Sequence, residues 1–245
     1  GGGNHFMEAQ RDESGMIWLM VHSGSRHTGL RIARHYNQLA IENSERRGVY
    51  VPKDLAALSL HDPAGQDYLH DMQWSTDYAL ENRKRMMHRM VEALEDLAAT
   101  AIDADLINIH HNFARAEEHF GRELIVHRKG ATSAFAGQTG IIPGSMGTAS
   151  YIVEGLGNEL SLKSCSHGAG RKLGRRAATK AITEQEFATS LAGTYSRAAR
   201  GYLDEAPSAY KDIDEVIERQ RDLVRVLHLL TPVITIKGDS KYRDD

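Results

Sequence analysis

Residues 106–163 read LINIHHNFARAEEHFGRELIVHRKGATSAFAGQTGIIPGSMGTASYIVEGLGNELSLK, and this stretch decides the fold class. Short apolar or alternating runs are separated by Gly, Asn and Pro, a pattern typical of β-strands joined by turns. The predicted strands are LINIH at 106–110, ELIVH at 123–127, GII at 140–142, SYIVEG at 150–155 and ELSLK at 159–163.

Helical patterns flank this region. Apolar residues at helical spacing predict helices over 30–47 and 64–99, the second without Pro or interior Gly after Gly65, and two more over 183–192 and 213–229. Strands are expected from the runs HFMEAQ at 5–10, MIWLMV at 16–21 and PVITIK at 232–237. The chain is therefore predicted to be an α+β protein with mixed sheets and long surface helices, with one domain over 1–238 and a short tail over 239–245.

Composition limits the function classes. The chain has 245 residues, a formal net charge of −3 and 41% hydrophobic residues, which gives no overall charge that would advertise nucleic-acid binding. A single cysteine excludes a disulfide framework and fits a reducing compartment. No window is apolar enough for a membrane span and no signal peptide is visible. We therefore expect a cytoplasmic location, no membrane contact, and nucleic-acid contacts only through local basic patches.

Several of the 13 histidines lie at the ends of predicted strands rather than on helical faces. His5 precedes one apolar run, His22 follows another, and His110 and His111 follow a third. Loops at strand ends are where enzymes commonly place metal ligands. His5, His22 and one of His110 and His111 are therefore candidate ligands, although any one such histidine would more often be structural.

Residues 162–176, LKSCSHGAGRKLGRR, place one histidine among small residues and then supply cations. Gly168, Ala169 and Gly170 leave room for backbone N–H groups to approach an anion beside His167, and an imidazole can act as a covalent nucleophile. Basic residues follow at Arg171, Lys172, Arg175 and Arg176. The pattern indicates phosphate chemistry at His167, and the alternative is a glycine turn beside a solvated basic face.

Six motifs together resemble the RtcB family of RNA ligases, in the family's order and from the first residue to Gly238. They are GGGNHF at 1–6, HSGSR at 22–26, HHNFA at 110–114, GIIPGSMG at 140–147, SCSHGAGR at 164–171 and TPVITIKG at 231–238. Each motif is weak by itself, because it consists mostly of Gly, Ser and His, but six in order are specific.

The resemblance implies a GTP- and Mn²⁺-dependent ligase that joins RNA 2′,3′-cyclic phosphate or 3′-phosphate ends to 5′-hydroxyl ends through a covalent GMP on His167. It implies two Mn²⁺ ions with His5, His22 and His111 as ligands, His111 being preferred because it directly precedes Asn112. It assigns Arg26 and Arg171 to RNA. The implied nucleotide-binding residues are Asn4, His5, Phe6, Met7, Glu8, His111, Asn112, Pro143, Gly144, Ser145, Met146, Ser150, His167, Gly168, Ala169, Gly170 and Lys237, and the aromatic face of Tyr210 could stack on the base.

The resemblance also implies ligands that this sequence does not contain. Family members carry, upstream of the position of Gly1, a segment with an Asp and a Cys that bind the metals, so we expect an RtcB-like fold lacking its N-terminal segment. Cys165 lies in the nucleophile motif and is expected to be a structural or tuning thiol. Two alternatives to a ligase remain: a remnant that binds nucleotide and RNA without ligating, and a metal-dependent cyclic phosphodiesterase.

Overall fold

The computed structural model describes residues 5–52, 55–102, 105–196 and 200–238. The described chain forms two compact units, one containing residues 5–22 and 86–238 and the other residues 23–85. The predicted tail, 239–245, lies outside the described residues. The first unit carries the strands and nearly all of the candidate site, so its architecture decides where the functional side chains lie.

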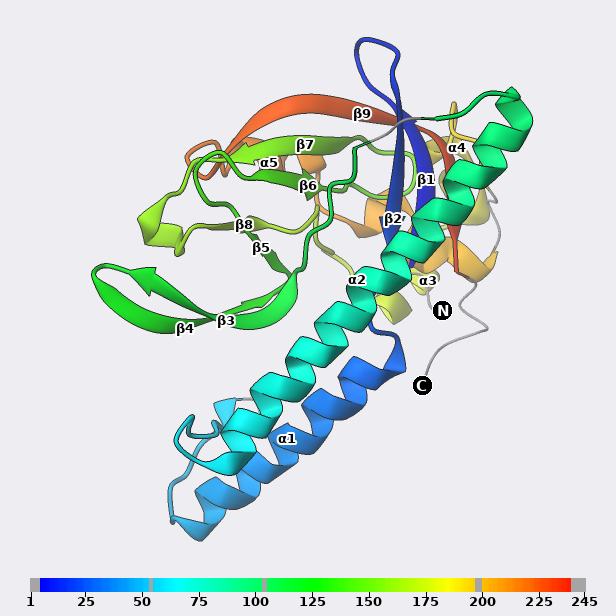
Figure 1. The fold of residues 1–245 in the computed structure, drawn as a ribbon. Helices are drawn as coiled ribbons and strands as arrows, with labels where there is room; N and C mark the ends of the chain where they lie inside the picture. The colour runs from blue at the N-terminus through cyan, green and yellow to red at the C-terminus, as the bar shows by residue number, and fades with distance from the viewer. Residues whose placement is uncertain (1–4, 53–54, 103–104, 197–199, 239–245) are drawn as a thin grey trace. The chain divides into compact units, whose positions relative to one another are not determined.

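A five-stranded sheet forms the centre of the first unit (Figure 1). Its strands are β1 (Phe6–Arg11), β2 (Ile17–His22), β6 (Thr139–Ile142), β7 (Ser150–Gly155) and β9 (Val224–Lys237), in the order β2-β1-β9-β7-β6. All neighbouring strands are antiparallel. The predicted α+β character is thus present, but the described strands pair antiparallel and not in mixed sheets.

The β1–β2 hairpin turns at Asp12. The Asp12 carboxylate accepts hydrogen bonds from the backbone and side chain of Ser14, from the Met16 N–H and from the Trp18 indole N–H. These hydrogen bonds hold the pKa of Asp12 well below its usual range. The resulting register places Phe6 opposite His22 on one side and opposite Lys237 of β9 on the other. His22 ends β2, Phe6 begins β1 and Lys237 ends β9, so the three residues lie side by side at one end of the sheet.

Two smaller strand pairs belong to the same unit. The strands β3 (Asn112–His119) and β4 (Arg122–Lys129) form a hairpin, whose two-residue turn needs positive φ at both positions; Phe120 has φ 53° and Gly121 has φ 68°. The short strand β5 (Ala131–Ser133) pairs with β8 (Ser164–Ser166), which ends one residue before His167. Both pairs therefore end near candidate residues.

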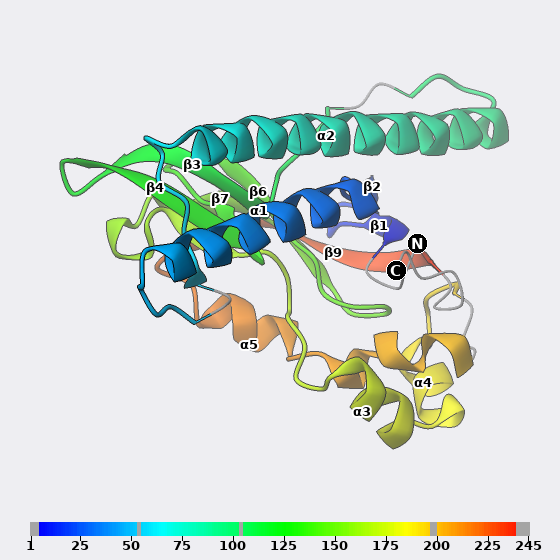
Figure 2. The same ribbon diagram turned by 90° about the horizontal axis from the view of Figure 1, so that it is seen from below.

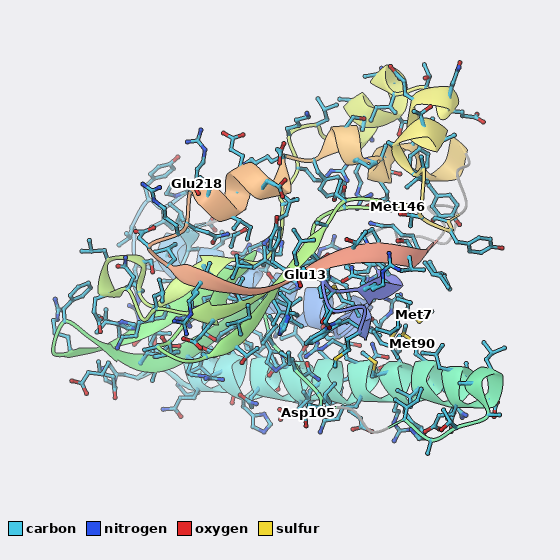
Figure 3. All side chains as sticks on the ribbon, turned by 90° about the horizontal axis from the view of Figure 1, so that it is seen from above. Met7, Glu13, Met90, Asp105, Met146 and Glu218 are labelled. Carbon is cyan, nitrogen blue, oxygen red and sulfur yellow. The ribbon has the colours of Figure 1, made fainter. Side chains whose placement is uncertain are left out.

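Three short helices complete the unit: α3 (Arg175–Ala181), α4 (Glu184–Ser190) and α5 (Ile213–Glu218). Figure 2 shows α3 and α4 close together. Residues of both helices, among them Phe187 of α4, form a buried cluster with Met146 from the loop after β6 (Figure 3). The helix α4 begins with a capping box, in which Thr183 and Glu186 satisfy each other's backbone N–H groups.

The second unit is built on two helices, α1 (His27–Arg46) and the first part of α2 (Pro63–Ala98), which lie side by side in Figure 1. The Tyr36 hydroxyl donates a 2.7 Å hydrogen bond to Asp71, and the Tyr36 ring contacts that of Tyr68. The bounds confirm both long predicted helices within a few residues. No helix in the described part of the chain is long and apolar enough to cross a membrane.

Several predicted elements are wrong. Residues 106–110 are irregular, and the strand starts only at Asn112; residues 159–161 form a 3-10 helix rather than a strand. The helix predicted over 213–229 ends at Glu218, and β9 begins at Val224, long before the predicted start at Pro232. Pro232 lacks an N–H group and sits where the β1–β9 register shifts, so the long strand tolerates a proline that suggested a strand start. The helix α3 was not predicted.

Candidate active site

His22 and His111 meet at the centre of the candidate site. His22 is the last residue of β2 and His111 directly precedes β3, and their Nε2 atoms are 3.3 Å apart. The Phe6 ring lies 5.1 Å from the His22 ring, as the strand register requires. The two strand junctions therefore deliver their imidazoles to one point, although the residues before His111 are not a strand.

The His22 imidazole is held neutral. Burial lowers its pKa to about 3, and the positive charges of the protonated forms of His111 and His167, with Lys237 and His5, act in the same direction. A neutral imidazole has a lone pair on one ring nitrogen, which is the state that binds a metal ion. The environment therefore suits His22 as a ligand.

The spacing of the pair fits a shared ion. Two imidazole nitrogens that bind the same metal ion, each at about 2.1 Å, stand roughly 3.0 to 3.4 Å apart when the nitrogen–metal–nitrogen angle is 90° to 109°. The observed 3.3 Å lies in this range. Across residues 5–52, 55–102, 105–196 and 200–238, however, no group of three His, Cys, Asp or Glu side chains could hold an ion. Two of the three predicted ligands, His22 and His111, therefore meet as a pair. The third, His5, is connected to them by its charge, which lowers the pKa of His22.

His167 lies beside this pair. It directly follows β8, and its ring centroid is 5.1 Å from that of His111. Burial lowers its pKa, while a hydrogen bond to the backbone of Gly130 partly opposes the effect. Gly130 has φ +66°, and a Cβ at this position would lie 3.3 Å from the His167 ring. A glycine is therefore needed both for the backbone conformation and for the close approach of the ring.

Two glycine-containing loops pack against each other next to His167. The Ala169 N–H donates to the Pro143 carbonyl over 3.0 Å, and a Cβ on Gly168 would lie 3.0 Å from the same oxygen. Gly144 is tighter still, since a Cβ would lie 2.1 Å from the Ala149 carbonyl. Its N–H faces the Ser150 hydroxyl at 3.3 Å. The predicted loops therefore pack so closely that a Cβ at Gly144 or Gly168 would crowd the neighbouring backbone.

The neighbours of these loops are placed less simply. The backbone and hydroxyl of Ser145 are held by the Thr148 hydroxyl, and Gly170 has φ +70° with its carbonyl accepting from Lys211. Met146 is 1% exposed and belongs to the apolar cluster of the α3–α4 region. Its side chain is therefore part of the core.

Lys237 joins the aromatic part of the site. Its Nζ lies 5.2 Å from the centroid of the Phe6 ring and 5.9 Å from that of Tyr210, within the range of cation–π attraction. Its counter-ion is Glu205, whose Oε2 is 2.9 Å from Nζ, with both side chains almost fully buried. Sequence reasoning placed Lys237 here only through the family resemblance, and it missed Glu205.

Glu205 also ties down the basic segment after His167. It accepts hydrogen bonds from Tyr210 and Arg175, and Arg171 donates to the Tyr210 hydroxyl while stacking 4.8 Å above its ring. Burial and then the charge of Glu205 raise the pKa of Tyr210. Two of the four predicted phosphate-facing cations, Arg171 and Arg175, are thus engaged by this buried carboxylate and its neighbours.

Glu8, a residue of β1, belongs to a second group of buried polar side chains. Its carboxylate accepts from Gln10 and from the Thr235 hydroxyl, and Gln10 also donates to Ser150. Burial raises the pKa of Glu8 to about 7, although Lys237, Thr235 and Gln10 act to lower it. Gln10 and Thr235 were missed, but the alternation of Glu8 and Gln10 in an otherwise apolar strand was a usable signal.

Five residues named in the sequence analysis remain to be placed. Met7 is a β1 residue paired with Val21 and Ile236, and the Asn112 side-chain oxygen accepts from the Gly130 N–H. Arg26 belongs to the second unit, where it precedes α1 with φ 59°. Asn4 lies outside the described residues. Cys165 is a buried free thiol beside the Thr132 hydroxyl, and burial raises its pKa, which fits a structural role.

The fold and the site define an α+β protein with three histidines and a buried lysine at one end of an antiparallel sheet. The histidines are His22, His111 and His167, and the lysine is Lys237. Comparison with known proteins is consistent with this description. A model of the family described as tRNA-splicing ligase RtcB matches residues 1–238. The chain belongs to the RtcB family.

Individual relatives agree. The chain is 43% identical over 245 residues to the RNA-splicing ligase RtcB of Escherichia coli K12, covering 97% of this chain and 60% of that protein. It is 34% identical over 276 residues to RNA-splicing ligase RtcB of Mycobacterium tuberculosis, and 32% identical over 282 residues to tRNA-splicing ligase RtcB of Thermococcus kodakarensis. The chain thus spans about 60% of the length of these three relatives.

Proposed function

We propose that this chain carries the guanylate-transfer centre of a GTP- and Mn²⁺-dependent RNA ligase, acting in the cytoplasm on RNA 2′,3′-cyclic phosphate or 3′-phosphate ends and 5′-hydroxyl ends. The observation that carries the proposal is the row of three imidazoles: His22 and His111 at 3.3 Å, with the His167 ring 5.1 Å from that of His111. A nucleophile next to a pair of metal-ligand candidates is the arrangement that phosphoryl transfer requires.

His167 is suited to attack phosphorus. Its pKa is lowered by burial, so the ring is neutral at pH 7, and the Gly130 backbone holds one ring nitrogen. The other nitrogen attacks the α-phosphorus of GTP, which forms a P–N bond and breaks the P–O bond to pyrophosphate. Divalent ions held by His22, His111 and His5, together with ligands beyond these, would neutralise charge on the triphosphate.

The guanylate then moves to RNA. An oxygen of the RNA 3′-phosphate attacks the same phosphorus and displaces His167, which forms an activated RNA end. The 5′-hydroxyl of the second strand attacks the RNA phosphate, loses its proton to solvent and releases GMP. A cyclic end is first opened by addition of water. Arg26 and Arg171 are the residues proposed to contact the RNA.

The guanine nucleotide is proposed to lie beside Lys237 and the two glycine-containing loops at 143–149 and 167–170. Phe6 and Tyr210 offer aromatic faces beside the Lys237 ammonium, and Glu8 offers a carboxylate to the base. The backbone at Gly170 can approach a phosphate, because nothing lies within 4 Å of its Cβ position, and Gly144, Ser145, Gly168 and Ala169 belong to the same proposed set. Asn4, Met7, Asn112, Pro143, Met146 and Ser150 complete the proposed set.

Intact-protein mass spectrometry after incubation with GTP and Mn²⁺ tests the proposal. We expect one added GMP, its loss in His167→Ala, and its retention in His127→Ala, since His127 is an exposed residue of β4. Covalent GMP that survives His167→Ala would refute the assignment of the nucleophile.

The same experiment tests the two alternatives to a ligase, a non-ligating remnant and a cyclic phosphodiesterase, and one observation favours each of them. The described residues supply a pair of metal ligands rather than three, as in a remnant that binds GTP without forming an adduct. The His22–His111 pair also does not need His167, as in a cyclic phosphodiesterase. A remnant would bind GTP but yield no adduct, and a phosphodiesterase would open cyclic phosphates without GTP and with His167→Ala.

A further inference from the structure

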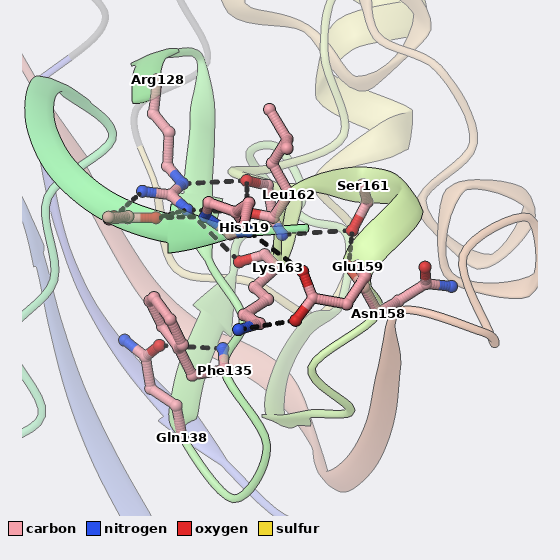
Figure 4. A network of polar contacts seen from close by, with 11 residues as sticks. His119, Arg128, Phe135, Gln138, Asn158, Glu159, Ser161, Leu162 and Lys163 are labelled. Atoms are coloured by element: carbon pink, nitrogen blue, oxygen red, sulfur yellow. Dashed lines mark hydrogen bonds and ion pairs between the residues drawn. The ribbon is translucent and has the colours of Figure 1, made fainter. Parts of the chain in front are cut away.

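A cluster of buried charges lies on one face of the β3–β4 hairpin, outside the candidate site. Glu117, His119 and Arg128 are 8%, 1% and 3% exposed, and we call these three residues the buried cluster. Figure 4 shows His119 and Arg128 with the contacts around them. Glu117 and His119 alternate on β3, and Arg128 pairs with Phe113 across the hairpin, so that all three side chains project from the same face. Charged side chains are rarely buried unless paired, so this cluster requires an explanation.

Arg128 connects the hairpin to a distant segment. Its guanidinium forms two hydrogen bonds with Glu117, of 2.6 and 2.9 Å. The same group donates to the Ser164 hydroxyl and to the Leu162 carbonyl, each at 2.9 Å. Burial alone would raise the pKa of Glu117, but the hydrogen bonds from Arg128 and His119 lower it overall, so the carboxylate is charged. One buried cation therefore joins β4 to the residues before β8.

The segment that Arg128 holds has an unusual backbone. Leu162 and Lys163 are consecutive non-glycine residues with φ 52° and 48°, a region that side chains with a Cβ disfavour. The Leu162 carbonyl accepts from Arg128, and the Lys163 carbonyl accepts from the Ala134 N–H at 2.7 Å. Such a backbone persists only where surrounding contacts define it, and Arg128 supplies one of them.

Both ends of this connection lead to the candidate site. Two residues after Arg128, the Gly130 N–H donates to the His111 carbonyl at 2.8 Å, and Gly130 contacts the His167 ring. Three residues after Ser164, the chain reaches His167 itself. The hairpin thus presents His111, the strand β8 presents His167, and their rings meet with centroids 5.1 Å apart.

We propose that Arg128 is a positioning residue: its guanidinium holds the hairpin that presents His111 against the segment that presents His167, and so fixes the spacing of the two rings. The proposal deepens the proposed function and rests on it for the role of His167. Arg128 contacts no reacting atom, and it acts only through the strands it joins.

The chain offers a matched control at the edge of the same network. Lys163 forms a 2.7 Å salt bridge with Glu159, and both side chains are partly exposed, at 22% and 45%. Glu159 also contacts His119 of the hairpin at 3.2 Å, so replacing Lys163 removes its ammonium group but leaves the Glu159–His119 contact and the Arg128 hydrogen bonds in place. Lys163→Met should therefore leave the spacing of the rings unchanged.

The test compares the wild-type protein with Arg128→Lys, Ser164→Ala and Lys163→Met. Arg128→Lys keeps the charge but loses the planar fork, whereas Ser164→Ala removes one uncharged hydrogen-bond partner. Three quantities are measured: single-turnover formation of the GMP adduct, the KM for GTP, and amide hydrogen exchange of residues 164–168 with residues 150–155 as reference.

For Arg128→Lys we expect an adduct rate at least about tenfold lower at an unchanged KM, because small misplacements of reacting groups are costly. Exchange should rise over 164–168 and not over 150–155. Ser164→Ala should show the same pattern more weakly, and Lys163→Met should match the wild type. A purely structural role for Arg128 would lower the unfolding temperature but leave the adduct rate per folded molecule unchanged.

The proposal is overturned if Arg128→Lys and Ser164→Ala form the adduct at the wild-type rate with unchanged exchange over 164–168. If Arg128→Lys does not fold, Ser164→Ala decides by the same two measurements. If the wild-type protein forms no adduct, the proposed function fails, and exchange over 164–168 in Ser164→Ala still decides whether Arg128 fixes this segment.

Discussion

The Nε2 atoms of His22 and His111 are 3.3 Å apart although the two residues are separated by 89 positions in the chain. One imidazole ends β2, and the other precedes β3. Burial and neighbouring positive charges hold His22 neutral, so its ring can present a lone pair.

Removing His22 should weaken metal binding. We expect His22→Ala to lower Mn²⁺ affinity by about tenfold or more, because one nitrogen donor is lost from a pair spaced for a shared ion. Titration followed by the electron paramagnetic resonance signal of free Mn²⁺ measures this. His110→Ala is the control, since the His110 ring packs against Phe113. Equal affinities for the two variants would contradict a ligand role for His22.

Gly130→Ala should damage the site as well as the backbone. A residue with a Cβ at φ +66° costs about 1–2 kcal/mol, and here the Cβ would also lie 3.3 Å from His167. Gly137→Ala is a matched control, because Gly137 has φ +77° with nothing within 4 Å of its Cβ. Urea unfolding should show similar losses for both variants, while only Gly130→Ala should slow formation of the GMP adduct. Equal adduct rates would show that contact with Gly130 does not orient His167.

Glu8 should make stability depend on pH. Its pKa is raised from 4.5 in the unfolded chain to about 7 in the folded protein by burial, so the folded state binds more protons between these values. The associated stability is therefore fully present below pH 4.5, falls as pH rises and is lost above pH 7, a total of about 3 kcal/mol.

Glu8→Gln should remove this dependence. The variant is expected to be about as stable as the wild type near pH 4.5 and more stable at pH 8, as measured by urea unfolding across this range. Glu118→Gln, at an exposed β3 position, should leave the wild-type profile intact. A Glu8→Gln profile parallel to that of the wild type would show that Glu8 ionises normally.

Glu205 should matter far more than an exposed carboxylate. Glu205→Gln leaves the buried Lys237 ammonium without its counter-ion, and such losses cost about 3–5 kcal/mol. Glu218, paired with Arg221 on the surface of α5, provides the comparison, and Glu218→Gln should cost less than about 1 kcal/mol. Urea unfolding of both variants decides the matter; comparable losses would mean that Glu205 is not a structural counter-ion.

The sequence predicted those elements whose local pattern agrees with their environment. The helices α1 and α2 carry a continuous apolar stripe, and β7 coincides with the run SYIVEG. By contrast, residues 219–231 combine apolar residues with helix-compatible spacing, and only pairing with β1 and β7 makes most of them a strand. Pairing across the sheet is a tertiary property that short windows do not contain.

The candidate site divides in the same way. Histidines at the ends of predicted strands, and one before Gly168, were visible in the sequence, and His22, His111 and His167 do meet. Glu205 was missed because it lies in an ordinary-looking polar segment and becomes exceptional only through burial. The basic residues Arg171 and Arg175 suggested a phosphate-binding face, yet the buried carboxylate of Glu205 forms an ion pair with each of them.

β9 pairs with β1 along one side and with β7 along the other, so it lies between the strand that starts beside the metal-ligand candidates and the strand that follows the Gly144 loop. The strand β9 therefore fixes the position of one half of the site relative to the other. Residues two apart along this strand project from the same face of the sheet. An insertion of a single residue between the two pairings would turn Lys237 to the opposite face of the sheet and shift one half of the site against the other. The length of this strand therefore fixes the alignment of the two halves of the site.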